Sequence, residues 1–221
     1  GAGGAVEPAP GVVAPDDVLG AVGGDTVRVA AVRASSVTGT LQPIGGIGRR
    51  WRGRGVLLLV DAAQSVGHVP VDVEANCIDL LAFPGHKGLL GPLGTGGLYI
   101  RPGLEDVIEP VREGGTGSVS ESDEHPVTMP DRYEPGSHNP IGLIGLSEGV
   151  RWILDRGIGS IRAHEESRMR VMMDRLPGDG AGLRVLGPAS IEDRVGVFSV
   201  AHESLGAATL AAALESHAGV L

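Results

Sequence analysis

The chain has 221 residues and a formal net charge of -9 at pH 7. An acidic balance of this size argues against nucleic acids and anionic membrane surfaces as partners. No run of apolar residues is long enough to span a membrane, and no basic segment precedes an apolar one near the start, so the sequence predicts a cytosolic protein. The single cysteine, Cys77, excludes an internal disulfide and a cysteine-rich metal site.

Predicted helices and strands alternate along the chain, as is typical of an α/β protein. The first is a short helix after Pro15, with Asp16 and Asp17 as candidate caps. The predicted elements that follow are a strand over 26–32, a helix over 43–54, strands over 56–60, 78–83 and 96–100, helices over 141–156 and 161–176, a strand over 194–200 and an alanine-rich helix from about residue 205.

Three of these elements carry further expectations. The strand over 56–60 has no polar alternation, which is typical of a parallel strand covered on both faces. Gly157 is expected to end the helix over 141–156, and Ser160 to cap the next helix. Because the helix over 141–156 is expected to link two domains, we predict a large domain over 1–156 and the start of a small α/β domain over 157–221.

Lys87 is the only lysine of the chain, whereas arginine supplies the other cations. Lysine is normally among the commonest residues, so its single retention suggests a role that arginine cannot fill. Arginine stays protonated, whereas a lysine amine desolvated in a pocket can lose its proton and form a Schiff base with a carbonyl group. Lys87 is therefore the first candidate for a catalytic residue.

Polar side chains gather after two of the predicted strands. Asp61 and Gln64 follow the strand over 56–60, and His86 stands beside Lys87 after the strand over 78–83. If the strands are neighbours, these side chains meet at the edge of the sheet where α/β proteins bind ligands. Taken alone, Asp61 is better interpreted as a helix cap and His86 as a loop histidine. Together with Lys87 they indicate a pyridoxal phosphate site, in which a carboxylate holds the ring nitrogen, an amide donates to the ring oxygen and the lysine binds the aldehyde.

Four blocks of sequence resemble the class V aminotransferase family, and specifically its cysteine desulfurase and selenocysteine lyase branch. They are VDAAQS at 60–65, DLLAFPGHKGLLGP at 79–92, GGTGS at 114–118 and RYEPGSHN at 132–139. Their order and spacing make the resemblance specific, and it covers nearly the whole chain. It implies a fold type I pyridoxal phosphate enzyme that forms a homodimer with its active site at the subunit interface.

The resemblance also implies roles for single residues. Lys87 would be the Schiff-base lysine, Asp61 the partner of the pyridine nitrogen and Gln64 the donor to the ring oxygen. His86 and Gly85 would contact the phosphate, and Thr116 would reach the phosphate of the neighbouring subunit's cofactor.

Two positions depart from the family pattern. Pro84 replaces a serine or threonine, and Ser36 replaces an asparagine. Proline has neither a hydroxyl group nor an amide hydrogen to offer a phosphate, and serine is shorter than asparagine. We therefore expect weakened cofactor binding.

Relative to the family, the chain is expected to begin partway through the large domain and to end before the loop of the nucleophilic cysteine. Cys77 is not expected to be that cysteine, because it precedes the strand that leads to Lys87, and a lone cysteine is more often a small buried hydrophobe.

Several functions remain open. The first is a cysteine desulfurase that converts cysteine, or a similar small amino acid, to alanine and passes sulfur on to a cysteine as persulfide, with a sulfur-acceptor protein as a possible partner. A class V aminotransferase or related lyase is a close variant, and an inert remnant is the alternative outside enzymes. A phosphate-binding loop is rejected because His86 precedes and Gly88 follows Lys87, and no His-Glu-x-x-His arrangement indicates a zinc site.

Overall fold

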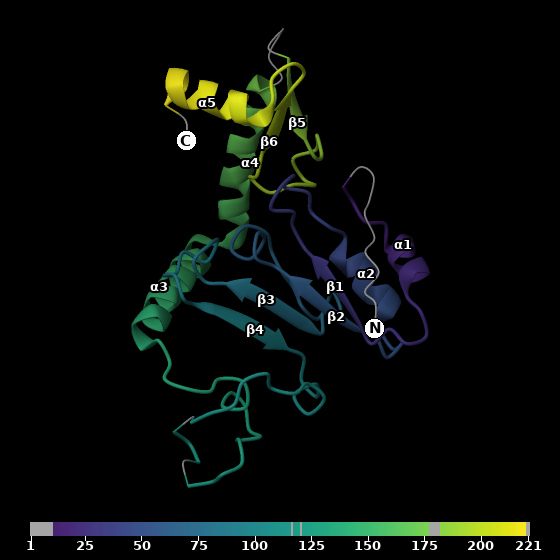
Figure 1. Ribbon diagram of the computed structural model, residues 1–221, viewed down its shortest axis with the longest axis vertical. Coiled ribbons are helices and arrows are strands. Elements are labelled where there is room, and N and C mark those ends of the chain that lie inside the picture. The colour runs from purple at the N-terminus through teal and green to yellow at the C-terminus, as the bar shows by residue number, and fades with distance from the viewer. Residues whose placement is uncertain (1–10, 116, 120, 177–181, 220–221) are drawn as a thin grey trace.

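The computed structural model describes residues 11–115, 117–119, 121–176 and 182–219. Its elements are α1 (Pro15–Ala21), β1 (Arg28–Val32), α2 (Ile44–Trp51), β2 (Leu57–Asp61), β3 (Leu80–Pro84), β4 (Gly96–Ile100), α3 (Pro140–Arg156), α4 (Ile158–Arg175), β5 (Leu183–Leu186), β6 (Ser199–His202) and α5 (Ala207–Ala218). Figure 1 shows a sheet with α1 and α2 at its β1 side, and α4, β5, β6 and α5 beyond one end of it.

The main sheet has the strand order β1-β2-β3-β4. The first three strands run parallel, and β4 pairs antiparallel with β3. In this register Asp61 is opposite Val32 on one side and Ala82 on the other. The carboxyl ends of β1, β2 and β3 therefore meet at one edge, which confirms that the strands before Asp61 and Lys87 are neighbours.

The hydrophobic core lies between this sheet and the first two helices. Ile47 and Trp51 of α2 are buried together with Leu58 and Val60 of β2, the last two being fully inaccessible. The alternate residues of β2, Leu57 and Leu59, are only half-buried. The expected burial of this strand on both faces is therefore met on one face only.

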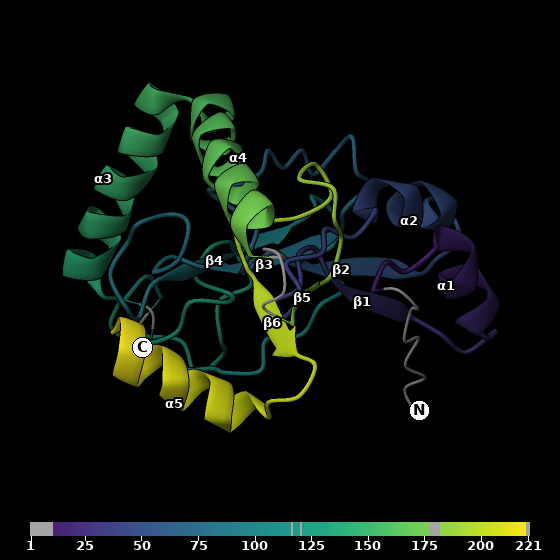
Figure 2. The same ribbon diagram turned by 90° about the horizontal axis from the view of Figure 1, so that it is seen from above.

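Two helix caps differ from the expectation. The N-cap of α1 is Ala14, with no side-chain hydrogen bond, and Asp16 instead pairs with Arg50 of α2 at 2.8 Å. Gly157, with a φ of 80°, ends α3 as predicted and is also the N-cap of α4. Ser160 therefore lies inside α4 rather than capping it. Positive φ angles are easily adopted by glycine, and the chain turns sharply there (Figure 2).

The second sheet consists of β5 and β6, which pair antiparallel. β5 was not expected, and β6 covers only the end of the strand predicted over 194–200. The reason is that residues before β6 bond to the loop after β1 instead of to a strand: the amide of Val195 donates to the carbonyl of Gly39 at 2.8 Å.

The structure does not test the predicted domain boundary at residues 156 and 157, which stays a prediction. Among the described residues, no helix has the length and apolar character needed to cross a bilayer.

Candidate functional site

Three loops leave the sheet at the edge formed by the carboxyl ends of its parallel strands. Ser36 lies in the loop after β1, Gln64 in the loop after β2 and Lys87 in the loop after β3. The parallel register of the three strands brings these loops side by side. The residues predicted from separate parts of the sequence therefore share one edge.

The loops after β2 and β3 interlock through two glycines. A Cβ atom on Gly67 would collide with the backbone of Gly88, and one on Gly88 would collide with the carbonyl oxygen of Val66. Gly67 also has a φ of 88°, which favours glycine. Because Gly88 directly follows Lys87, this contact holds the lysine loop against the loop that carries Asp61 and Gln64.

Asp61 is the last residue of β2, and its side chain is exposed. One carboxylate oxygen, Oδ1, accepts a hydrogen bond from the amide of Ala63 at 2.9 Å. This is the local cap that the residue type alone suggests. Within the described part of the chain the second oxygen, Oδ2, makes no hydrogen bond, so one acceptor remains for a ligand.

Gln64 is half-buried and lines a cavity of about 500 Å³ between the loop after β2, helix α4 and residues 195–198. Its side-chain amide has no hydrogen-bond partner among the described residues. The amide can therefore donate to a ligand.

Lys87 and His86 are both exposed. The desolvation expected for the Lys87 amine is therefore not found within this chain. The loop itself is well defined, since the amide of Leu90 donates to the carbonyl of Lys87 at 2.9 Å and the amide of Gly91 to that of Gly85 at 2.8 Å. The amine of Lys87 forms no ion pair with any described residue, so it is accessible to an aldehyde.

The part of the site predicted to bind a phosphate has few donors. The amide of Gly85 donates to the carbonyl of Thr95 at 2.8 Å, and Pro84 has no amide hydrogen. Ser36 is exposed. Thr116 lies outside the described residues. Phosphate contacts by Gly85, His86, Ser36 and Thr116 thus stay predictions.

Cys77 lies at the opposite edge of the sheet, before β3, whereas Lys87 follows the carboxyl end of that strand. It is half-buried rather than buried, and its Sγ atom is 3.6 Å from Nη1 of Arg52. Both residues line a second cavity, of about 720 Å³. The position of Cys77 agrees with the interpretation that it is not the sulfur-accepting cysteine.

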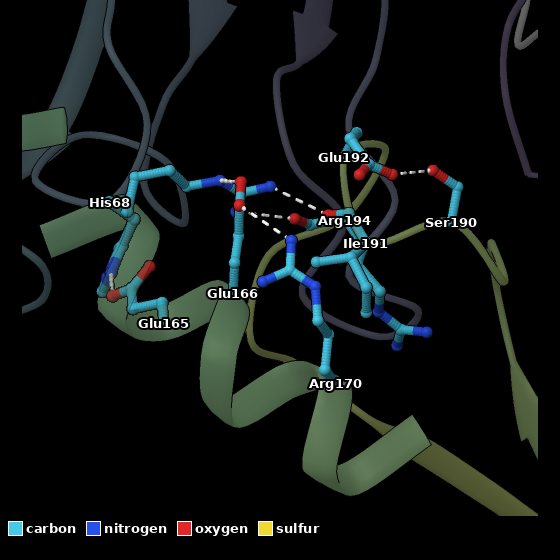
Figure 3. A network of polar contacts seen from close by, with 9 residues as sticks. His68, Glu165, Glu166, Arg170, Ser190, Ile191, Glu192 and Arg194 are labelled. Carbon is cyan, nitrogen blue, oxygen red and sulfur yellow. Dashed lines mark hydrogen bonds and ion pairs between the residues drawn. The ribbon is translucent and has the colours of Figure 1, made fainter. Parts of the chain in front are cut away.

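A polar network that the sequence did not indicate holds α4 against the sheet edge (Figure 3). His68, in the loop after β2, pairs with Glu165 of α4. Arg162 of α4 pairs with Glu166 at 2.8 Å and donates to the carbonyl of Arg194 at 2.8 Å. His68 lies shortly after the sequence block at 60–65, four residues beyond Gln64. No local sequence pattern marks Glu165 or Arg194.

The ring side of the site fits pyridoxal phosphate. A carboxylate oxygen of Asp61, the amide of Gln64 and the amine of Lys87 are free among the described residues and lie on adjoining loops. These are the chemical groups that a pyridine nitrogen, a phenolate oxygen and an aldehyde require. The phosphate side fits less well, because Pro84 and Gly85 offer no free backbone donor.

Comparison with known proteins shows the family to which the chain belongs. The profile of the family described as "Aminotransferase class-V" matches residues 7–221. A probable cysteine desulfurase of Methanothermobacter thermautotrophicus is 41% identical over 157 residues, which are 70% of this chain and 39% of that protein. A probable cysteine desulfurase of Pyrococcus abyssi is 35% identical over 192 residues, 86% of this chain and 47% of that protein.

Solved structures show the same likeness. The apo structure of a cysteine desulfurase from Thermococcus onnurineus matches with a TM-score of 0.84 and 34% identity, over 94% of this chain and 52% of that one. The cysteine desulfurase CsdA from Escherichia coli, at 24% identity, shares the fold with a TM-score of 0.75, over 91% of this chain and 50% of that one. The chain thus spans about half the length of these relatives. It belongs to the class-V aminotransferase family, as a homologue of cysteine desulfurases with the α/β fold of fold type I pyridoxal phosphate enzymes.

Proposed function

We propose that this chain contributes the lysine-bearing part of a pyridoxal phosphate site and that the site removes sulfur from cysteine. The observation that supports the proposal is the interlocking of the loops after β2 and β3, because one of these loops follows Asp61 and carries Gln64 and the other carries Lys87. The relatives named as cysteine desulfurases support the choice of reaction.

Each of these residues has one task in the proposed reaction. Pyridoxal phosphate, when bound, supplies an electron sink for the α-carbon of an amino acid. Lys87 would bind the aldehyde of the cofactor with its amine and would move the α-proton of the substrate as a base. Asp61 would hold the ring nitrogen in its protonated form, and Gln64 would donate to the ring oxygen. His86 would contact the phosphate, whereas the amide of Gly85 already donates to the carbonyl of Thr95.

The sulfur must leave to a thiol other than Cys77, because Cys77 lies at the opposite edge of the sheet. The proposed acceptor is therefore a cysteine outside this chain, on a sulfur-acceptor protein or elsewhere in the assembled enzyme. We propose a homodimer, in which Thr116 of each subunit reaches the phosphate of the other's cofactor.

The reaction is tested by supplying the chain with pyridoxal phosphate, cysteine and excess dithiothreitol. One thiol takes the sulfur as persulfide and a second releases it as sulfide, so alanine, sulfide and the oxidised thiol are the expected products. The Cys77→Ser variant should form them at the unchanged rate. Appearance of the keto acid of cysteine instead of alanine would favour an aminotransferase, and absence of any product in the wild type would favour an inert remnant.

Replacing Asp61 with alanine is expected to weaken cofactor binding by about tenfold or more, since a charge-assisted hydrogen bond contributes roughly 1.5–3 kcal/mol. Alanine formation should stop, because nothing then holds the ring nitrogen protonated. Asp61→Asn should bind the cofactor at an intermediate strength but be as inactive as the alanine variant. The fold should persist, because the lost contact to Ala63 costs only about 1 kcal/mol.

Absorption titration with pyridoxal phosphate measures the first effect, and alanine analysis the second. Circular dichroism of each variant shows whether the fold is kept. An Asp61→Ala variant with wild-type turnover would contradict the role of this carboxylate.

A further inference from the structure

His68 links the lysine loop to helix α4. Its backbone amide donates to the carbonyl of Ser65 at 3.0 Å, which keeps it in the turn after β2. Its ring nitrogen Nδ1 lies 2.5 Å from Oε1 of Glu165, a residue 97 positions away in the sequence (Figure 3). The His68 side chain is 34% exposed and that of Glu165 is 23% exposed. The pair is therefore a partly buried connection between two distant segments.

The other edge of the His68 ring faces the residue after Lys87. A Cβ atom on Gly88 would lie 2.7 Å from both Cδ2 and Nε2 of His68. Gly88 thus fits against the ring only because it has no side chain. The ring therefore packs against the lysine loop beside the backbone contacts that Gly88 makes with Gly67 and Val66.

Glu165 in turn determines the orientation of the ring. Its second oxygen, Oε2, is buried and has no hydrogen-bond partner among the described residues. A carboxylate with one buried, unpartnered oxygen depends on its remaining contact, since a buried charge without a partner is costly. When Nδ1 donates to this carboxylate, a neutral His68 ring carries its proton on Nδ1, and Nε2, on the side of Gly88, carries none.

We propose that His68 is a positioning residue for Lys87, with Glu165 fixing the ring and the ring fixing Gly88. This role rests on the proposed function, in which Lys87 is the reactive amine. It couples the placement of α4 to the placement of the lysine, although neither His68 nor Glu165 needs to touch the cofactor.

The single lysine makes the test specific. Reductive methylation with 13C-formaldehyde labels Lys87 as the only side-chain amine, and its nuclear magnetic resonance signal can be followed against pH without any cofactor. Glu165→Ala is expected to shift this signal, because the Lys87 side chain then changes its surroundings. Amide hydrogen exchange in residues 85–91 should become faster by between about threefold and tenfold.

Two further variants separate positioning from general stability. In Glu165→Gln the side-chain carbonyl still accepts a hydrogen bond from Nδ1 of His68. The Lys87 signal and the amide exchange of residues 85–91 should therefore stay near those of the wild type. His68→Asn can keep a contact with Glu165 but withdraws the ring from Gly88, so it should shift the Lys87 signal even if Glu165→Ala does not fold. Arg170→Gln, on the same helix, is the matched control and should change nothing at Lys87, because the ion pair of Arg170 is with Glu166, at 3.4 Å, and not with Glu165.

A change confined to Lys87 and residues 85–91 supports the positioning role. An unchanged signal in folded His68→Asn, or an equal rise in exchange along the whole chain, overturns it. Because these readouts need no cofactor, they stand even if the wild type fails to bind pyridoxal phosphate, which would overturn only the proposed function.

Discussion

Replacing Lys87 with alanine is expected to abolish the near-visible absorption that pyridoxal phosphate acquires on this chain. That absorption requires a covalent bond between the aldehyde carbon and a primary amine, and Lys87 supplies the only lysine amine. Lys87→Arg should fail equally, because the planar guanidinium stays charged and cannot form the bond. The loss should be complete, in contrast to the graded effect expected at Asp61.

The measurement is an absorption titration of each variant with pyridoxal phosphate, before and after addition of borohydride, which should remove the band in the wild type. Circular dichroism serves as the control for folding. Lys87 is exposed and forms no ion pair with any described residue, so neither substitution should unfold the chain. An unchanged band in Lys87→Ala would reject the role of this residue.

Arg194→Met is expected to lower the free energy of unfolding by about 3 kcal/mol. The Arg194 side chain is fully buried, and burial lowers the pKa of its guanidinium. Nη1 donates to the carbonyl of Pro188 at 2.8 Å, and Nη2 to those of Val197 at 2.7 Å and Thr38 at 3.4 Å. The guanidinium also stacks on the ring of Phe198, 4.3 Å from its centre. Methionine fills a similar volume but leaves these carbonyl oxygens without their donor.

Thermal unfolding followed by circular dichroism measures this effect, and a loss of about 3 kcal/mol corresponds to a fall in Tm of roughly 6–12 °C for a chain of this size. Arg170→Met is the matched control, because Arg170 is half exposed on α4 and its replacement should change stability by less than about 0.5 kcal/mol. Equal melting of the two variants would show that the buried contacts of Arg194 contribute little.

Local patterns in the sequence predicted most of the main sheet. The apolar runs that became β2 and β3 end at Asp61 and just before the lysine loop, so their residue types were enough to place the site at the carboxyl edge. The sequence blocks around Asp61 and Lys87 also identified the family correctly. Local information suffices here because parallel strands share an edge wherever they are neighbours.

The contacts that support the site could not be predicted in the same way. Glu165 and His68 form a hydrogen bond although they lie 97 residues apart in the sequence, and Arg194 donates to Thr38 across 156 residues. Such pairs depend on how α4 and the segment before β6 pack on the sheet, which no local pattern reports. The same packing explains why residues 194–197 are not a strand: they bond to the loop after β1 rather than to a neighbouring strand.

The proposal that Lys87 binds the aldehyde of pyridoxal phosphate is tested by identifying the residue to which the cofactor attaches. The chain is mixed with the cofactor at millimolar concentration, reduced with borohydride and digested, and the modified peptide is identified by mass spectrometry. The matched control is the double variant Lys87→Arg with Arg52→Lys, which keeps a single, exposed lysine but moves it to the opposite edge of the sheet. We expect the cofactor, fixed by borohydride, on Lys87 of the wild type and far less of it on residue 52 of the double variant. Equal labelling of both lysines, or labelling of the wild type at its amino terminus alone, would contradict it.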